Sequence, residues 1–382
     1  MSGRLVSVRL PRQPLLRHVL LALVGAAALY GITTALGAYN DFQVGEIGAF
    51  AVALAGLSLL TGQNGQISLG HGALMAVGGY AVALLMGHTH LDLVVDLVVA
   101  ALVAGAVGAI VGIPAARLSG PYLAGVTLML ALAVPLIAAQ YGSVFGGDQG
   151  LTTTPPPGPS SVSPERWLAW IQLAAALVVM VLLANLLRSR YGRAFRAVRD
   201  DEVAASLAGI HVARTKVLAF TVSAACAGLG GALLVLSTGV VNTGEFPLAL
   251  SIELLAGMVI GGAGTLAGAW WGAVALVYAP QWATSVSNHL SLGTSAAAYL
   301  ADAMFGVVLI AVVLVAPSGI QGLLGRAARG TWARAAGRFP PPGAGLQATA
   351  QPPGAGPQAT AQDGSTQRQA SERGAIHEIP RT

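Results

Sequence analysis

The stretch LVVDLVVAALVAGAVGAIVGI, residues 93–113, decides the fold class of this chain. Apart from Asp96 it is uninterrupted apolar sequence, and a helix of this length, rising about 1.5 Å per residue, crosses a hydrocarbon core of roughly 30 Å. Similar runs recur from Val19 to Ala316, without the alternation of a membrane β-barrel. The sequence therefore predicts an all-α polytopic membrane protein.

The composition supports the same class. Of 382 residues, 55% are hydrophobic and 9% are charged, whereas a soluble domain carries about 25% charged residues. The single cysteine, Cys226, lies in an apolar run, so no disulfide framework and no cysteine-based metal site is expected. No metal site is predicted elsewhere, because a lone histidine such as His71 does not make one.

The apolar pattern predicts about ten membrane-spanning helices. The second and eighth look short for a crossing. The ten predicted spans are Val19–Leu36, Ile47–Leu60, Ile67–Met86, Leu93–Ile113, Tyr122–Ala139, Trp167–Leu187, Val217–Thr238, Leu250–Ile260, Leu266–Trp282 and Tyr299–Ala316.

The distribution of positive charge predicts the orientation. Ten crossings place both termini on one side, and if that side is the cytoplasm, all but Arg166 of the 20 Lys and Arg residues lie inside. This agrees with the positive-inside rule. A cleaved signal peptide is less consistent with residues 1–36, because no small-residue cleavage site follows the first apolar run. We expect a multi-pass protein of the plasma (inner) membrane.

This topology divides the chain into three parts. Residues 1–18 are expected to form a basic cytoplasmic N-terminus, residues 19–317 the transmembrane domain, and residues 318–382 a cytoplasmic tail. Within the domain, residues 140–166 form an irregular extracytoplasmic loop and residues 188–216 a cytoplasmic segment. The tail repeats PPGAGLQATAQ as PPGAGPQATAQ and is predicted to be disordered from about residue 340.

A polar cluster, TGQNGQISLGH at residues 61–71, interrupts the apolar pattern between the second and third spans. Polar groups at membrane depth persist where they face protein or a water-filled path, and a broken helix there exposes backbone groups. For His71, a packing or hydrogen-bonding role is favoured over a proton relay. The cluster is therefore predicted either to line a translocation pathway for a polar solute or to form a tight turn for helix packing. The pathway candidates are Gln63, Asn64, Gln66, Ser68 and His71, and backbone or packing roles are predicted for Gly62, Gly65 and Gly70.

A second cluster, GGAGTLAG at residues 261–268, lies between the eighth and ninth spans. Its Gly261, Gly262 and Gly264 are predicted to serve backbone and packing roles, because small residues allow close helix contacts in lipid. Glu253, in the preceding span, is a further pathway candidate, since an ionisable group there is costly unless it is paired or hydrated. An interfacial carboxylate at the outer helix end is an equally good interpretation of Glu253.

The 188–216 segment contains a predicted short helix lying parallel to the membrane. Asp200 or Asp201 can cap its N-terminus, Glu202 suits its first turn, and Gly209 can end it in the left-handed conformation. Ala204 and Ala205 would form a small-residue face that docks into a groove on a cytoplasmic partner. A basic topology anchor is the simpler alternative for this segment.

At these residues the chain resembles the LivM-type membrane permeases of ATP-binding-cassette importers for branched-chain amino acids. The resemblance runs from about Glu46 to Leu324. It rests on GQNGQISLGHGALMAVGGYA at 62–81, GRAFRAVRDDEVAASLAGIHVARTKVLAF at 192–220, SIELLAGMVIGGAGTLAGAWWGA at 251–273 and VLVAPSGIQGLL at 313–324.

The resemblance implies an importer-permease fold and a non-enzymatic translocation subunit. It implies that Asp201, Glu202, Ala204, Ala205 and Gly209 couple the chain to ATPases, although Val203 stands where the family pattern has glutamate. The implied partners are two cytoplasmic ATPases, a second related permease and an extracytoplasmic binding protein. The chain itself would carry no cofactor, with ATP and Mg on the ATPases.

The residues independently argue against a nucleotide site on this chain, because its only lysine, Lys216, follows no phosphate-binding glycine loop. Two transport alternatives remain. One is a urea or short-amide permease of the same type. The other is a stand-alone ion-coupled transporter, which would need carboxylates deep in several helices where only Glu253 is a candidate. A membrane enzyme is less consistent with the absence of a catalytic constellation.

Overall fold

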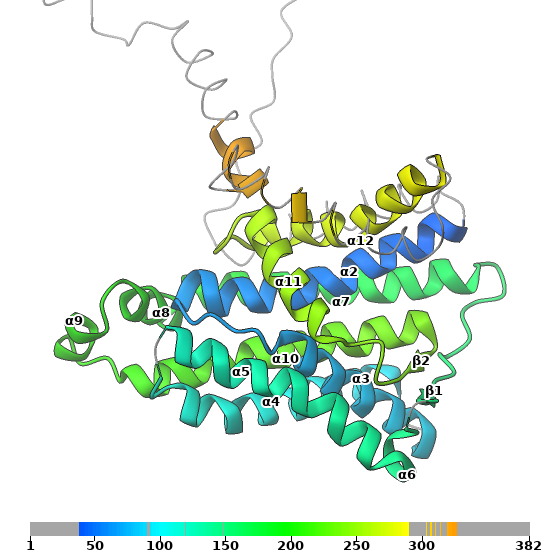
Figure 1. Cartoon of the computed structure of the whole chain (residues 1–382), viewed down its shortest axis with the longest axis horizontal. Coiled ribbons are helices and arrows are strands. Elements are labelled where there is room, and N and C mark those ends of the chain that lie inside the picture. The colour runs from blue at the N-terminus through cyan, green and yellow to red at the C-terminus, as the bar shows by residue number, and fades with distance from the viewer. Residues whose placement is uncertain are drawn as a thin grey trace, which may run out of the picture. The chain divides into compact units, whose positions relative to one another are not determined.

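The computed structural model describes residues 38–89, 92–118, 120–147, 149–289 and 319–326, with single positions between 303 and 314. Figure 1 shows mainly helices. In chain order the elements are α2 (Ala38–Leu57), the π-helix η1 (Ser58–Gln63), α3 (His71–His88), α4 (Leu93–Ala115), α5 (Pro121–Gln140), α6 (Gly142–Phe145), β1 (Leu151–Thr152), α7 (Pro164–Arg188), α8 (Arg190–Asp200), α9 (Glu202–Leu207), α10 (Val212–Thr238), β2 (Val240–Val241), α11 (Leu248–Gly261) and α12 (Leu266–His289).

Five stretches among the described residues are helical, long and apolar enough to cross a membrane. They are Asn40–Gln63, Leu93–Ala115, Tyr122–Gln140, Pro164–Arg188 and Val212–Thr238. The prediction of a helical, multi-spanning chain is confirmed. The predicted spans Val19–Leu36 and, except for isolated positions, Tyr299–Ala316 lie outside the described residues, as do the N-terminus and the tail beyond residue 326. Ten crossings and the location of the termini stay predictions.

Charged residues inside helices explain where the predicted boundaries were wrong. The second span is not short, because its helix starts at Ala38, ahead of Asp41. Asp41 is fully buried and pairs with Arg166, with 3.0 Å between Arg166 Nε and Asp41 Oδ2. Likewise α10 begins at Val212 rather than Val217 and so includes the buried Lys216. A prediction from apolar runs ends a span at a charged residue, whereas a membrane helix tolerates a charge that is paired.

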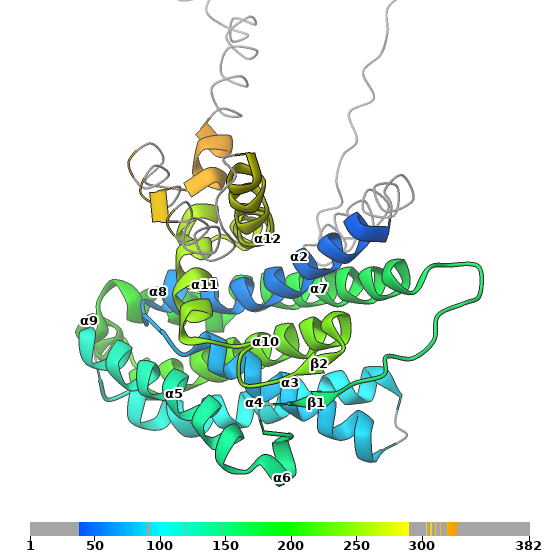
Figure 2. The ribbon, with the colours of Figure 1, turned by 45° about the vertical axis from the view of Figure 1, so that its right-hand side comes forward.

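Among the five candidate membrane spans, α2 and α10 are the most buried. In α2 and its continuation, 78% of the apolar window is buried, and in α10 67%, against 22–33% for α4, α5 and α7. Helix α10 contacts α2, α3 and α4 (Figure 2). Small residues permit these contacts: a Cβ on Gly78 of α3 would overlap the Gly228 carbonyl of α10, and one on Gly108 of α4 would overlap Ala224. Close packing of this kind holds helices together where lipid provides no hydrophobic drive.

The loop at residues 140–166 is more ordered than predicted. It carries the four-residue helix α6 and the strand β1, which pairs antiparallel with β2, Leu151 opposite Val241 and Thr152 opposite Val240. The Thr153 N–H also donates to the Gly239 carbonyl at 2.8 Å. The all-α prediction therefore holds for the helices, but a short two-stranded sheet was not predicted, and it fixes this loop to the end of α10.

Candidate functional site

The predicted interruption of the second and third spans is present. The π-helix η1 ends at Gln63, residues 65–70 are not helical, and α3 begins at His71 rather than at Ile67. The Thr61 hydroxyl closes the turn by donating to the Gln66 carbonyl at 2.9 Å. Backbone groups freed by the break are thus partly satisfied locally, as a helix end within a membrane protein requires.

Four of the predicted pathway residues lie buried within the chain. Asn64, Gln66, Ser68 and His71 are each at most 3% exposed. The Gln66 amide donates to the Lys216 carbonyl at 3.1 Å, which joins the break to the base of α10. Gln63 is only partly buried and contacts another segment, described below. The role of these five residues in lining a pathway stays a prediction.

His71 bridges three helices. Its Nε2 lies 3.0 Å from the Ser223 hydroxyl of α10, and that hydroxyl donates to the Gly56 carbonyl of α2 at 2.7 Å. These contacts agree with the favoured packing and hydrogen-bonding role. Three buried polar atoms of the break have no hydrogen-bond partner among the described residues: Asn64 Nδ2, Gln66 Oε1 and His71 Nδ1.

Glu253 lies in the second turn of α11 and is half-buried. Helix α11 spans only Leu248–Gly261, so the prediction of a short eighth helical segment is confirmed. Its Ser251 hydroxyl accepts from the Gly72 N–H at 3.0 Å and holds α11 against the start of α3. Whether Glu253 faces a pathway stays a prediction.

The two glycine clusters meet in space. A Cβ atom added to Gly62 would overlap the backbone of Gly264, so these two backbone segments lie at a distance that only glycine permits. The Gln63 side-chain amide donates to the Gly264 carbonyl across this approach. Gly264 also has φ +80°, a left-handed backbone that favours glycine. We call the Gly62–Gly264 approach the glycine contact; it agrees with the packing roles predicted for both residues, which stay a prediction.

The remaining glycines of the clusters also pack closely. A Cβ on Gly70 would approach the Thr127 carbonyl of α5 to 2.7 Å, and one on Gly65 would approach the Arg199 side chain to 2.9 Å. Gly261 faces the Gly268 carbonyl of α12, and Gly262 lies against Gly319. These close approaches agree with the predicted backbone and packing roles, which stay predictions for these residues as well.

The 188–216 segment contains a helix that the sequence interpretation missed. Helix α8 buries Gly192, Phe195 and Val198 and exposes most of its arginines. This i, i+3, i+6 spacing of buried residues is typical of an amphipathic helix. The Ser189 hydroxyl caps it by accepting from the Tyr191 N–H at 3.1 Å. The spacing of the apolar residues could have predicted this helix. It was overlooked because arginines lie among them.

Helix α9 is the predicted short helix, and Asp201, rather than Asp200, caps it. Asp201 Oδ1 accepts from the N–H groups of Val203 and Ala204 at 2.8 and 3.0 Å. At the other end Gly209, with φ +82°, donates to the Ser206 carbonyl while the Ile210 N–H donates to the Ala205 carbonyl. This is the Schellman arrangement that glycine favours.

The exposed face of α9 differs from the one predicted. Ala205 is 4% exposed and faces the chain, whereas Val203 is 68% exposed and Leu207 84%. Ala204 remains exposed. The prediction of a docking face made by Ala204 and Ala205 is therefore corrected, because the helix turns Ala205 inward to pack and presents larger apolar side chains outward.

Helix α9 is tied to α10 by an ion pair. Lys216 Nζ lies 2.6 Å from Glu202 Oε1, and the Lys216 side chain is 6% exposed against 49% for Glu202. Glu202 thus occupies the first turn of α9, as predicted, and also neutralises a buried ammonium group, which would be costly to leave unpaired.

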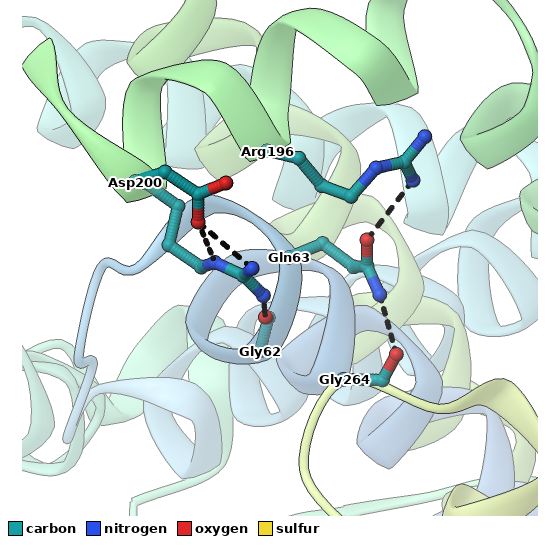
Figure 3. Close-up of polar contacts among 6 residues, drawn as sticks. Gly62, Gln63, Arg196, Asp200 and Gly264 are labelled. Atoms are coloured by element: carbon teal, nitrogen blue, oxygen red, sulfur yellow. Dashed lines mark hydrogen bonds and ion pairs between the residues drawn. The ribbon is translucent and has the colours of Figure 1, made fainter. Parts of the chain in front are cut away.

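Two arginines of α8 reach the glycine contact. Arg196 Nη1 donates to Gln63 Oε1 at 3.3 Å, and Arg199 Nη1 donates to the Gly62 carbonyl at 2.9 Å. Figure 3 shows Gln63 between Arg196 and Gly264. The contacts bring residues 62–66, α8 and the 261–268 turn together, which are the segments that the predicted topology assigns to one side. The Asp41–Arg166 pair lies at the opposite end of α7.

These features define a multi-pass helical membrane protein with a polar, glycine-rich break and a capped surface helix at one end. Residues 45–313 match the family described as the permease component of branched-chain amino acid transport systems. The chain belongs to this family.

Named relatives agree. The chain is 30% identical over 290 residues to the high-affinity branched-chain amino acid transport system permease protein LivM of Escherichia coli (strain K12), covering 69% of this chain and 66% of LivM. It is 26% identical over 310 residues to LivH of Salmonella typhimurium, covering 74% and 94%, respectively. It is 28% identical over 305 residues to BraD of Pseudomonas aeruginosa, also covering 74% and 94%. No solved structure matches the chain.

Proposed function

We propose that this chain is the translocation subunit of an ATP-binding-cassette importer for branched-chain, hydrophobic amino acids. The observation that carries the proposal is the family match over residues 45–313, together with named relatives that are permease proteins of such systems. The matched region covers 66% of the length of LivM, so the substrate and partners of this chain are part of the proposal. The relatives do not favour a urea or short-amide substrate.

Helix α9 is the proposed contact with a partner ATPase. It is closed at both ends by Asp201 and Gly209, and it exposes Val203 and Leu207. Apolar side chains on a short, well-ended helix suit docking into a groove. The conformation of α9 would then depend on Asp201, Glu202, Ala204, Ala205 and Gly209. The contact with the ATPase would be made by Val203 and Leu207.

The polar break is the proposed moving part of the pathway. Buried polar atoms are normally hydrogen-bonded, and Asn64 Nδ2, Gln66 Oε1 and His71 Nδ1 have no hydrogen-bond partner among the described residues. An alternating-access cycle would move the break between two arrangements, in one of which such atoms meet water or substrate. Gln63, Ser68 and Glu253 are proposed to belong to the same path.

The complete importer is proposed to contain two ATPases that bind ATP and Mg, a second related permease and an extracytoplasmic binding protein. This chain would hold no cofactor and catalyse no reaction. It would lie in the plasma (inner) membrane with ten crossings and both termini in the cytoplasm. The excess of Lys and Arg on the predicted inner segments supports this orientation.

A charge on α9 tests the docking proposal. Leu207→Asp should prevent the ATPases from co-purifying with the permease and lower leucine uptake about tenfold or more, because burying an unpaired carboxylate in an interface costs several kcal/mol. Ala213→Asp is the matched control, since it adds the same charge at an exposed position in the first turn of α10. Normal ATPase recovery with Leu207→Asp would contradict the proposal.

A further inference from the structure

We propose that Arg196 and Arg199 are positioning residues that transmit movement of α8 and α9 to the glycine contact. The inference rests on the proposed function, since it requires a partner that moves α9. It concerns the connection inside this chain between the surface helix and the polar break. The two arginines lie one turn apart on α8, and both extend to η1.

Arg199 holds the end of η1. Its Nη1 donates to the Gly62 carbonyl at 2.9 Å, where the last carbonyls of a helix lack partners within that helix. The aliphatic part of the side chain passes over Gly65, where a Cβ would come within 2.9 Å of Arg199 Cγ. A glycine at position 65 therefore leaves the room that this arginine needs.

Arg196 joins three segments. Its Nη1 donates to the Leu187 carbonyl at the end of α7 and to Gln63 Oε1, each at 3.3 Å. Gln63 links Arg196 to the segment ahead of α12, because its Nε2 donates to the Gly264 carbonyl (Figure 3). A planar guanidinium can make both bonds at once, which a lysine ammonium group does with less geometric control.

The backbone makes α8 and α9 a connected pair. Only Asp201 separates Asp200, the last residue of α8, from α9, and Asp201 is itself the cap of α9. The Lys216–Glu202 ion pair adds a second attachment, to α10, whose Lys216 carbonyl accepts from Gln66. A displacement of α9 can therefore be transmitted to the break along two routes, through α10 and through α8. Along the second route, the two arginines connect α8 to Gly62 and, through Gln63, to Gly264.

The first test measures coupling in the complete importer reconstituted in vesicles. Relative to the unaltered chain, the double variant Arg196→Gln/Arg199→Gln should keep ATP hydrolysis within about twofold. Leucine taken up per ATP should fall about tenfold, on the scale of losing a hydrogen bond to a charged donor. Arg193→Gln is the control for loss of an arginine from α8, since it removes one positive charge while its side chain makes no hydrogen bond among the described residues. An unchanged ratio in the double variant, or an equal fall of hydrolysis and uptake, would overturn the inference.

The second test needs no transport activity. Spin labels on Leu207→Cys and Ala263→Cys, in the purified chain with Cys226→Ala, report the separation of α9 from the 261–268 turn; both labelled sites are exposed. The double arginine variant should broaden the distance distribution, and Arg193→Gln should not. An unchanged distribution would overturn the arginine connection. If it broadens as expected while the unaltered importer takes up no leucine, the proposed function fails and the connection stands.

Discussion

Gly62 and Gly264 join the two glycine clusters, because two backbones meet where any side chain would intrude. Each glycine by itself looks like ordinary helix packing in a chain with 50 glycines. Their pairing could not be read from sequence, since the two positions are far apart in the chain and share only a short motif. The Gln63 hydrogen bond to the Gly264 carbonyl shows that the approach is also polar.

Gly62→Ala should destabilise the chain by about 1–3 kcal/mol, the usual cost of forcing an extra carbon into a packed contact. The midpoint of unfolding in detergent measures it. Gly125→Ala in α5 is the matched control, because nothing lies within 4 Å of a Cβ at that position, and it should be neutral or slightly stabilising. Equal midpoints for the two variants would contradict the glycine contact.

At the scale of elements, the 188–216 segment is two helices rather than one. Sequence reasoning found α9 because its end signals, Asp201 and Gly209, are local and chemically distinctive. It missed α8, whose few buried residues stand among arginines, and it chose the wrong exposed face for α9. Which side of a short helix packs against the chain depends on tertiary contacts, such as the Lys216–Glu202 pair, that no local pattern contains.

That ion pair should couple α9 to the base of α10. In a double-mutant cycle of Glu202→Gln and Lys216→Met, we expect a coupling energy of about 0.5–1 kcal/mol, because Glu202 is half exposed and solvent weakens the pair. Glu202→Gln alone should also speed hydrogen exchange of the α9 amides. Additive effects in the cycle, with unchanged exchange, would show that the pair contributes nothing.

At the scale of the whole molecule, hydropathy predicted the membrane class and the order of the described helices. Charge distribution predicted which connecting segments share a side, and the structure brings residues 62–66, α8 and the 261–268 turn together. The pattern failed where charges are paired inside helices, at Asp41 and Lys216, because it counts a charge as an end. It also could not predict the β1–β2 pairing, which depends on residues distant in sequence.

The sidedness can be measured directly with an impermeant thiol reagent on intact cells. The native thiol of Cys226 is buried, so background labelling should be low. Thr154→Cys, exposed beside β1, should react from outside, whereas Ala213→Cys, exposed in the first turn of α10 and outside the proposed ATPase contact, should react only after the cells are permeabilised. Labelling of Ala213→Cys in intact cells would reverse the predicted orientation.

The most direct measurement compares radiolabelled leucine uptake into vesicles holding this chain alone with uptake into vesicles holding it with its ATPases, related permease and binding protein. The proposed function predicts accumulation against a gradient only in the complete assembly and only with ATP, and little uptake of labelled urea. Concentration of leucine by the chain alone, driven by an ion gradient and indifferent to ATP, would contradict it.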